Sequence, residues 1–191
     1  MPWWSLNNHL RSESVNTNMK RRRITAFGSS RLPESDPIFD DVLNLGKRLG
    51  HAGWDAVTGG HQGMMAAICR GIRAGGGHVR GITLERFPTP PGNHLSEEVR
   101  ARNFFERMQI LIEQTDAWLV LPGGLGTLAE LAMSWDLVAI GVLEPRPLIL
   151  YGDTWAPLLA SLRESMVLSV DHAFDLVTHC RTHDEVLATL A

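Results

Sequence analysis

Short, almost wholly apolar segments alternate along this chain with segments of helical period, and this alternation constrains the fold more than any other feature. A strand that is buried on both faces of a parallel sheet has a nearly continuous apolar sequence. The segments with that character are residues 24–27, 54–60, 78–84, 116–121, 146–151 and 174–179. Helical segments separate them, so the sequence predicts an α/β fold in which a doubly wound parallel sheet carries helices on both faces.

The predicted helices have apolar residues at intervals of three and four positions, or a recognisable cap. One long helix is expected from Ser96 onward, with its apolar side chains, at positions 104, 108, 111 and 112, in the core. The same helix would carry Arg100, Arg102 and Arg107. Near the end of the chain, residues 182–185 have the S/T-x-x-E spacing that caps a helix start.

A length of 191 residues predicts one domain. Residues 1–20 are polar and without clear period, so we expect a flexible N-terminal extension followed by a single nucleotide-binding domain at residues 21–191. No apolar run reaches the ~18 residues that span a bilayer, and residues 1–20 lack the pattern of a signal peptide. We therefore expect a cytoplasmic protein with no membrane partner.

The composition excludes several classes of function. The only lysines are Lys20 and Lys47, and neither position suits a pyridoxal-phosphate enzyme or a P-loop NTPase. Cys69 and Cys180 form no CxxC pair, so neither a disulfide framework nor a zinc site is expected. A net charge of −3 offers no broad basic surface for nucleic acid, and the basic run at 20–23 is expected to be solvated.

Three of the predicted strands end in glycine-containing turns. The turns contain Gly28 and Ser29; Gly59, Gly60 and Gly63; and Gly123, Gly124 and Gly126. Ligands of an open parallel sheet bind beyond the carboxyl ends of the strands, and the helix that follows each turn offers N–H groups to a phosphate. A single glycine turn can simply join a strand to a helix, but three along one edge predict a phosphate-bearing ligand. The first of these turns is not part of a G-x-G-x-x-G motif, so an NAD-type site is not supported.

Glu130 follows the third turn and has two interpretations. Thr127 and Glu130 have the spacing of a capping box, in which the glutamate would only stabilise the start of a helix. Alternatively, the carboxylate faces the crevice of the phosphate turn and acts on the ligand. Arg107 also has two interpretations: it is either a solvent-facing residue of a helix or a residue of the site.

The segment PGGLGTLAE, residues 122–130, resembles the PGGxGTxxE signature of the Lonely Guy family, long mislabelled as lysine decarboxylases. The segments FGSSR, TGGHQGMMAA, RNFFERM and DAWLVLPGG occur in the family's order, so the resemblance covers residues 22–152. It implies a Rossmann-like fold, usually a homodimer, and hydrolysis of the N-glycosidic bond of nucleoside 5′-monophosphates. The products would be ribose 5-phosphate and a free base, which is a cytokinin in the best-known cases. No cofactor is implied, and the scarcity of lysine agrees that the decarboxylase name is wrong.

The resemblance implies that Glu130 and Arg107 are the catalytic pair and that Arg102 is the first arginine of an R-x-F-F-x-R pattern. It implies that the glycine turns hold the phosphate and ribose, through Gly59, Gly60, Gly63, Met64, Gly123, Gly124, Gly126 and Thr127. Cleavage of a ribosyl–nitrogen bond develops positive charge on the sugar, which a carboxylate stabilises. Arg107 would hold the phosphate or keep Glu130 ionised.

The chain departs from the family pattern at several positions. His61 and Gln62 replace a usual third glycine, Met108 replaces a lysine, and Met133 replaces a second glutamate. His61 is the one histidine expected near the ligand, and Trp135 is expected in the core, with stacking on a base as the alternative. These departures leave the identity of the base open. A second hypothesis is a protein that binds or carries a nucleotide or phosphorylated cofactor without cleaving it; hydrolysis requires Glu130, whereas binding alone does not.

Overall fold

The computed structural model describes residues 21–86, 94–167 and 172–191. Over these ranges, seven strands form one sheet: β1 (Arg22–Phe27), β2 (Trp54–Thr58), β3 (Val79–Leu84), β4 (Glu97–Ala101), β5 (Ala117–Val120), β6 (Leu148–Tyr151) and β7 (Val177–Cys180). The helices are α1 (Pro37–His51), α2 (Met64–Ala74), α3 (Phe104–Glu113), α4 (Leu125–Ala139), α5 (Trp155–Ser165) and α6 (His183–Thr189), with a 3₁₀ turn at Ala173–Leu176. The predicted extension at 1–20 and the proline-rich segment at 87–93 lie outside the described residues.

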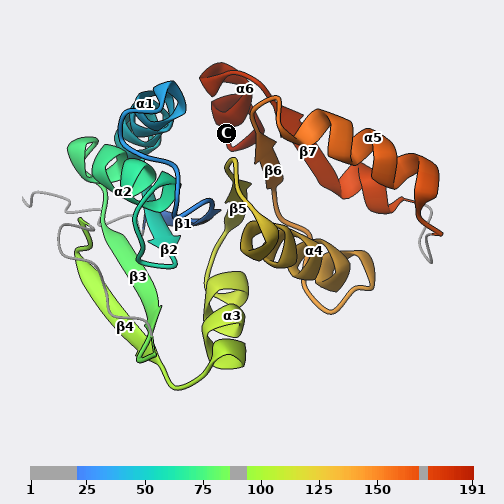
Figure 1. Ribbon diagram of the computed structural model, residues 1–191, viewed down its shortest axis with the longest axis horizontal. Helices are drawn as coiled ribbons and strands as arrows, with labels where there is room; N and C mark the ends of the chain where they lie inside the picture. Colours follow the sequence, from blue (N-terminus) through green and yellow to red (C-terminus); the bar gives the residue numbers. More distant parts are fainter. Residues whose placement is uncertain (1–20, 87–93, 168–171) are drawn as a thin grey trace, which may run out of the picture.

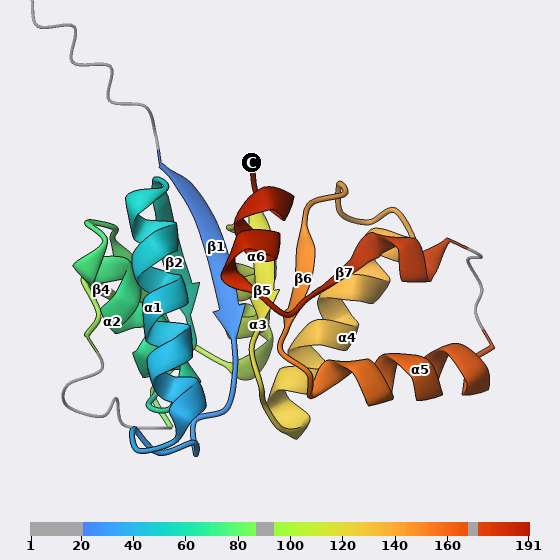
Figure 2. The ribbon, with the colours of Figure 1, turned by 90° about the horizontal axis from the view of Figure 1, so that it is seen from above.

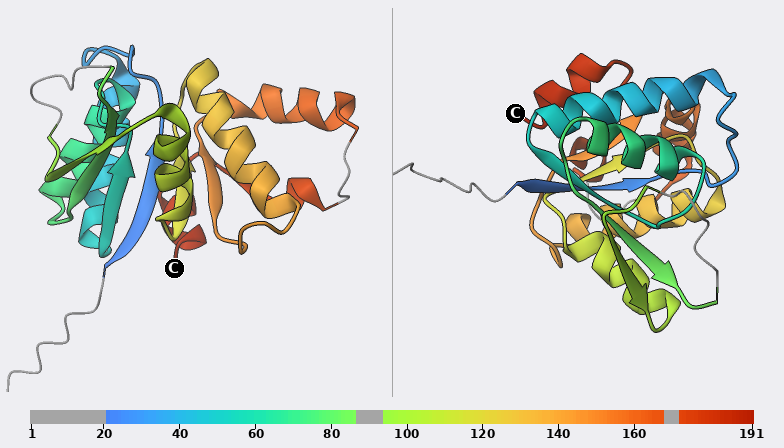
Figure 3. Two further views of the ribbon diagram at one scale, coloured as in Figure 1. Left: turned by 90° about the horizontal axis from the view of Figure 1, so that it is seen from below. Right: turned by 90° about the vertical axis from the view of Figure 1, so that its left-hand side faces the viewer.

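The strands lie in the order β4-β3-β2-β1-β5-β6-β7, and each neighbouring pair is parallel. The chain starts at the centre of the sheet with β1, builds one side out to β4, and returns beside β1 with β5 (Figure 2). Helices α1, α2 and α6 cover one face, and α3, α4 and α5 cover the other (Figures 1 and 3). The predicted doubly wound, Rossmann-like fold is therefore confirmed.

Each face of the sheet has its own core, because successive side chains of a strand point to opposite faces. In β5, Leu119 packs with the core under α1 and α2, whereas Trp118 and Val120 pack with the core under α3 and α4. All three side chains are fully buried. The continuous apolar sequence of the central strands thus results from burial on both faces.

The predicted long helix from Ser96 is wrong in its first part. Residues 97–101 form β4, which pairs with β3 at the edge of the sheet. Helix α3 begins only at Phe104, where the side chain of Asn103 caps it by accepting a hydrogen bond from Glu106 N at 3.0 Å. The prediction that Phe104 lies in the core is wrong, because this first residue of the helix is 50% exposed, whereas Met108, Leu111 and Ile112 are buried as predicted.

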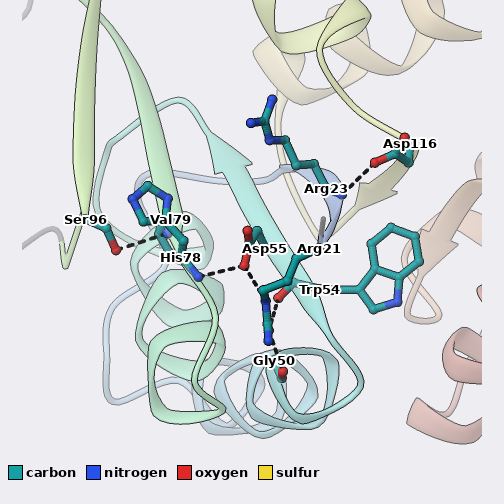
Figure 4. Close-up of polar contacts among 9 residues, drawn as sticks. All are labelled: Arg21, Arg23, Gly50, Trp54, Asp55, His78, Val79, Ser96 and Asp116. Carbon is teal, nitrogen blue, oxygen red and sulfur yellow. Dashed lines mark hydrogen bonds and ion pairs between the residues drawn. The ribbon is translucent and has the colours of Figure 1, made fainter. Parts of the chain in front are cut away.

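Arg21, in the basic run, belongs to a polar cluster at the amino-terminal ends of the strands (Figure 4). Its guanidinium donates to Asp55 Oδ1 at 2.7 Å and to the carbonyls of Gly50 and Trp54 at 2.7 and 3.0 Å. Asp55 also accepts from the backbone N–H of His78 at 2.8 Å. The expectation of a solvated charge is therefore wrong for Arg21, which joins the start of β1 to α1 and β2.

Glycines allow α1 and α2 to approach each other closely. A methyl group at Gly71 would overlap the carbonyl oxygen of Leu43 and would lie 2.8 Å from the Cα of Gly46. A methyl group at Gly46 would in turn lie 2.8 Å from the carbonyl oxygen of Ile68. These neighbours are backbone atoms, so they cannot rotate away as a side chain can.

We expect Gly71→Ala to lower the free energy of unfolding by about 1–3 kcal/mol, the usual range for an overpacked interior. Urea unfolding followed by circular dichroism measures this loss. Gly126→Ala is the matched control, because a methyl group there would meet no atom within 4 Å. Equal unfolding midpoints for the two variants would show that the close approach of α1 and α2 does not limit stability.

Within the described residues, no helix combines the length and apolar character needed to cross a bilayer.

Candidate active site

A cavity of about 470 Å³ lies at the carboxyl ends of the central strands, where the chain leaves β1 and β5 toward opposite sides of the sheet. Its volume is typical of ligand pockets, which range over roughly 300–1,000 Å³. The predicted site residues that line it are Gly28, Ser29, Gly59, Arg107, Gly124, Gly126, Thr127 and Glu130. The structure therefore brings the three predicted glycine turns and the predicted catalytic pair together.

The predicted residues Gly60, Gly63, Met64, Arg102 and Gly123 are not among the lining residues. Gly63 has a φ of 65° at the N-cap of α2, and the buried Met64 donates its N–H to the carbonyl of Ser29 at 2.8 Å. The N–H of Ser29 donates to the carbonyl of Pro122 at 3.0 Å. These two backbone hydrogen bonds connect the turns after β1, β2 and β5 to one another.

Arg102 lies away from the cavity. Its side chain is 84% exposed, and its Nε donates to both carboxylate oxygens of Glu106 at 3.0 Å. This ion pair lies at the start of α3, whereas Arg107, five residues after Arg102, does line the cavity.

Six lining residues were not predicted: Ser30, Arg31, Met65, Thr83, Leu84 and Phe104. Ser30 and Arg31 continue the turn after β1, so the FGSSR segment already contained a signal for them. Thr83, Leu84 and Phe104 reach the cavity only because β3 and α3 fold beside the turns, which no local pattern shows. His61 does line the cavity, as expected of the histidine in the glycine turn.

The start of α4 decides between the two interpretations of Glu130. The N-cap is Gly124, three residues before Thr127, and no side chain caps the helix. Thr127 lies inside the first turn, buried against Gly123, where a methyl group would overlap it. The capping-box interpretation is therefore wrong, and Glu130 lies in the second turn with its carboxylate available to other partners.

The amino-terminal end of α4 faces the cavity with exposed glycines, Gly124 and Gly126. The first N–H groups of a helix have no partner within the helix, and this end of the helix dipole is positive. A phosphate is the ligand that such an end binds best.

Arg107 and Glu130 meet at the floor of the cavity. Nη1 of Arg107 lies 3.9 Å from Oε1 of Glu130, and both side chains are about 15% exposed. The Nε of Arg107 donates to the carbonyl of Ile82 at 2.9 Å, which holds the guanidinium beneath the end of β3. The guanidinium also fills the space left by Gly59, where a methyl group would overlap Nη2. The surface interpretation of Arg107 is therefore wrong.

Burial controls the protonation of these groups. It raises the pKa of Glu130 to about 7, although the charge of Arg107 acts in the opposite direction. Burial also lowers the pKa of Arg107, an effect that Glu130 opposes. The pKa of His61 is lowered by burial and by the charge of Arg107, so its imidazole is neutral at pH 7. Glu130 can thus exchange a proton at physiological pH, as acid–base catalysis requires.

Trp135 belongs to the core and does not line the cavity. Its side chain is 8% exposed, its Nε1 donates to the carbonyl of Ala173 at 2.6 Å, and its ring contacts Phe174 edge to face. Across residues 21–86, 94–167 and 172–191, the structure contains no cluster of three or more His, Cys, Asp or Glu side chains that could hold a metal ion.

Gly59→Ala is expected to reduce activity much more than stability. The new methyl group would displace the end of the flexible Arg107 side chain, so the fold can absorb it, but the guanidinium would leave its position beside Glu130. We expect at least a tenfold loss of turnover with a change of unfolding free energy below about 1 kcal/mol. Steady-state kinetics and urea unfolding of the same preparation test both parts; a large loss of stability with normal turnover would contradict this role of Gly59.

Comparison with known proteins shows the family of this chain. A family model described as "Possible lysine decarboxylase" matches residues 65–190. A protein of Mycobacterium tuberculosis named cytokinin riboside 5′-monophosphate phosphoribohydrolase is 31% identical over 128 residues, which are 63% of this chain and 67% of that protein. The chain belongs to the Lonely Guy family.

A plant relative, cytokinin riboside 5′-monophosphate phosphoribohydrolase LOG2 of Arabidopsis thaliana, is 30% identical over 129 residues. The matched segment is 65% of this chain and spans only 61% of the plant protein. Among solved structures, TM1055 is 23% identical, with a TM-score of 0.71, over 88% of this chain and 98% of that one. The molybdenum cofactor binding protein of Rippkaea orientalis is 18% identical, with a TM-score of 0.69, over 90% and 96%. These two structures share the fold.

Proposed function

We propose that this protein hydrolyses the N-glycosidic bond of a nucleoside 5′-monophosphate to a free base and ribose 5-phosphate. The observation that carries the proposal is the Arg107–Glu130 pair, 3.9 Å apart and largely buried, in the same cavity as the amino-terminal end of α4. The relatives named cytokinin riboside 5′-monophosphate phosphoribohydrolase support this reaction, although the plant match spans 61% of its length. We further propose, from the names of these relatives, that the base released is a cytokinin.

The arrangement suits the chemistry of the reaction. The phosphate would bind at the end of α4, near Gly124 and Gly126, and this would place the ribose beside Glu130. As the bond between C1′ and the base nitrogen breaks, the base leaves with the electron pair and positive charge grows on the sugar. The Glu130 carboxylate stabilises that charge and accepts a proton from the water that attacks C1′. The departing nitrogen takes up a proton from solvent water, and Glu130 then returns its proton to solvent, so that one water is consumed in each cleavage.

Arg107 has two roles in this proposal. Its positive charge lowers the pKa of Glu130 against the effect of burial, so part of the carboxylate is ionised near pH 7. Its guanidinium also adds positive charge to the cavity that would receive the phosphate dianion. Arg31, which lines the same cavity, adds a second positive charge.

We also propose that two copies of the chain form a homodimer through the outer surface of α4. A groove there is lined by apolar residues including Leu128, Met133 and Val167. Large apolar side chains are exposed beside it, such as Leu125 at 84% and Ile140 at 53%. Exposed apolar surface of this extent is typical of a protein interface.

We expect Met133→Asp to convert the dimer to a monomer, because a buried, unpaired carboxylate is costly at an interface. Size-exclusion chromatography with light scattering measures the mass of both forms. Glu144→Gln is the control, since Glu144 is exposed and outside this groove. A wild-type protein that elutes with the mass of a single chain would refute the dimer.

The reaction is tested by incubating the purified protein with AMP and with N6-isopentenyl-AMP and separating the products by chromatography. We expect free base and ribose 5-phosphate in equal amounts, and no reaction with adenosine, which lacks the phosphate. The ratio of the two rates shows whether a cytokinin base is preferred. Nucleotides that raise the melting temperature without being cleaved would refute hydrolysis of these substrates and favour the binding protein.

A further inference from the structure

Phe104 is a large apolar side chain that the fold leaves half exposed, at 50%, on the lip of the cavity. It is the first residue of α3, and Arg107 follows at i+3, so both residues lie on the same face of the helix. The rise of an α-helix places them about 4.5 Å apart along the axis. Phe104, Arg107 and Glu130 line the same cavity, so Phe104 lies beside the Arg107–Glu130 pair.

The lining of the cavity changes in character from one end to the other. The turns after β1 and β5 contribute glycine backbone and hydroxyl groups, including those of Ser29 and Thr127. The segments on the β2–β3 side contribute three apolar side chains, Met65, Leu84 and Phe104, beside His61 and Thr83. Arg107 comes from α3, with Phe104, and Glu130 comes from α4, with Thr127, so the pair joins the two parts of the lining.

This division fixes the orientation of a nucleotide, an argument that rests on the proposed function. Glu130 lies five residues after Leu125, the first residue of α4, and therefore about 7.5 Å along the helix from the phosphate end. A ribose 5-phosphate held at that end places C1′ near Glu130. The base is bonded to C1′, so it continues past the pair toward Phe104.

We propose that Phe104 is the platform on which the base stacks, and that it makes the site selective for purine nucleotides over nucleotides with smaller bases. A base and a phenyl ring stack through their flat faces, and the two fused rings of a purine cover more of the phenyl than a pyrimidine does. A base stacked on this ring would cover the part of Phe104 that is exposed.

Phe105 provides a matched control within the same helix turn. Its side chain is 78% exposed and its ring contacts that of Phe104 edge to face, with 6.1 Å between the ring centroids. However, it borders a different groove, between α3 and α4, together with Met108 and Met133. Removal of Phe105 therefore removes as much aromatic surface without touching the cavity.

The test measures binding of AMP, UMP and ribose 5-phosphate by calorimetry, in a Glu130→Gln background that keeps the nucleotides intact. We expect Phe104→Ala to weaken AMP binding about tenfold or more, which is the usual effect of losing one aromatic stack. Binding of ribose 5-phosphate should change less than twofold, because it has no base to stack. The preference for AMP over UMP should shrink, because the larger purine loses more stacking than the pyrimidine. Phe104→Trp should restore AMP binding, and Phe105→Ala should leave all three affinities unchanged.

Equal losses for AMP and ribose 5-phosphate in Phe104→Ala would overturn the proposal, because the residue would then serve the whole site. Unchanged AMP affinity, or an equal loss in Phe105→Ala, would overturn it as well. The assay needs no turnover, so its outcome is separate from that of the proposed reaction. A wild-type protein that binds AMP through Phe104 but releases no adenine refutes the hydrolase and supports the platform.

Discussion

Glu130→Gln is expected to reduce base release by about 10²–10³-fold while leaving nucleotide binding within a few-fold of wild type. Glutamine has nearly the same shape as glutamate, so the second turn of α4 and its contact with Arg107 remain. It cannot carry the negative charge that stabilises the developing positive charge on the ribose, and it cannot accept a proton from water. Product chromatography measures the first effect, and calorimetry with AMP measures the second.

The same variant is expected to be more stable than wild type at pH 8. Burial raises the pKa of Glu130 to about 7 in the folded protein, above the ordinary value of 4.5 that applies in the unfolded chain. A group with a raised folded pKa contributes stability that is fully present below pH 4.5 and is lost as the pH rises through about 7. Glutamine does not ionise and avoids this loss.

Melting temperatures of wild type and Glu130→Gln should therefore diverge between pH 5 and pH 8, with the variant higher at pH 8. Glu144→Gln serves as the control, since Glu144 is exposed and should show no such divergence. An inactive variant whose melting curve follows wild type at every pH would mean that the Glu130 carboxylate is not destabilised by burial. Normal base release by Glu130→Gln would remove the glutamate from the mechanism altogether.

Arg107→Gln is expected to lower turnover by about 10²-fold or more and to move the remaining activity to higher pH. The positive charge of Arg107 opposes the effect of burial on Glu130, so its removal raises the pKa of Glu130 further. The ionised carboxylate then appears only at a higher pH, and the ascending limb of the pH–rate profile shifts in the same direction. Steady-state rates measured from pH 5 to pH 9 show both effects.

Arg102→Gln is the matched control for this experiment. Arg102 precedes the same helix and pairs with Glu106, but it is 84% exposed and does not line the cavity. We expect its turnover and pH profile to remain those of wild type. If the two variants lose activity equally, position within the cavity does not decide the role of these arginines, and the R-x-F-F-x-R pattern acts as a whole.

The central strands could be predicted from sequence because burial on both faces leaves them almost no polar positions. In β5, residues 117–120 are all buried. The strand β4 could not be predicted. In the part of the chain that the structure describes it is the last strand of the sheet, and its first four residues alternate between partly buried and exposed. Charged residues at such a spacing fit a helix as well as a strand, and only the pairing with β3 decides between them.

The site shows the same division between local and tertiary information. Glycine turns after apolar strands are local signals, so Gly28, Gly59 and Gly124 were predictable. The local pattern left Glu130 open, because the spacing of a capping box was present and only the actual start of α4 at Leu125 excludes it; its assignment to the site came from the family resemblance. Arg107 needed the family resemblance, since no local pattern shows that its side chain reaches the carbonyl of Ile82 on another strand.

Two main-chain hydrogen bonds, from Ser29 to Pro122 and from Met64 to Ser29, join the turns after β1, β2 and β5. A mutation that changes a side chain on the lip, such as His61 or Phe104, breaks neither of them. In the proposed binding mode, the turns that would hold the phosphate and the side chains that would meet the base can therefore change independently during evolution. A scaffold with this property can acquire a new base specificity by a single substitution while the turns proposed to bind the phosphate stay unchanged.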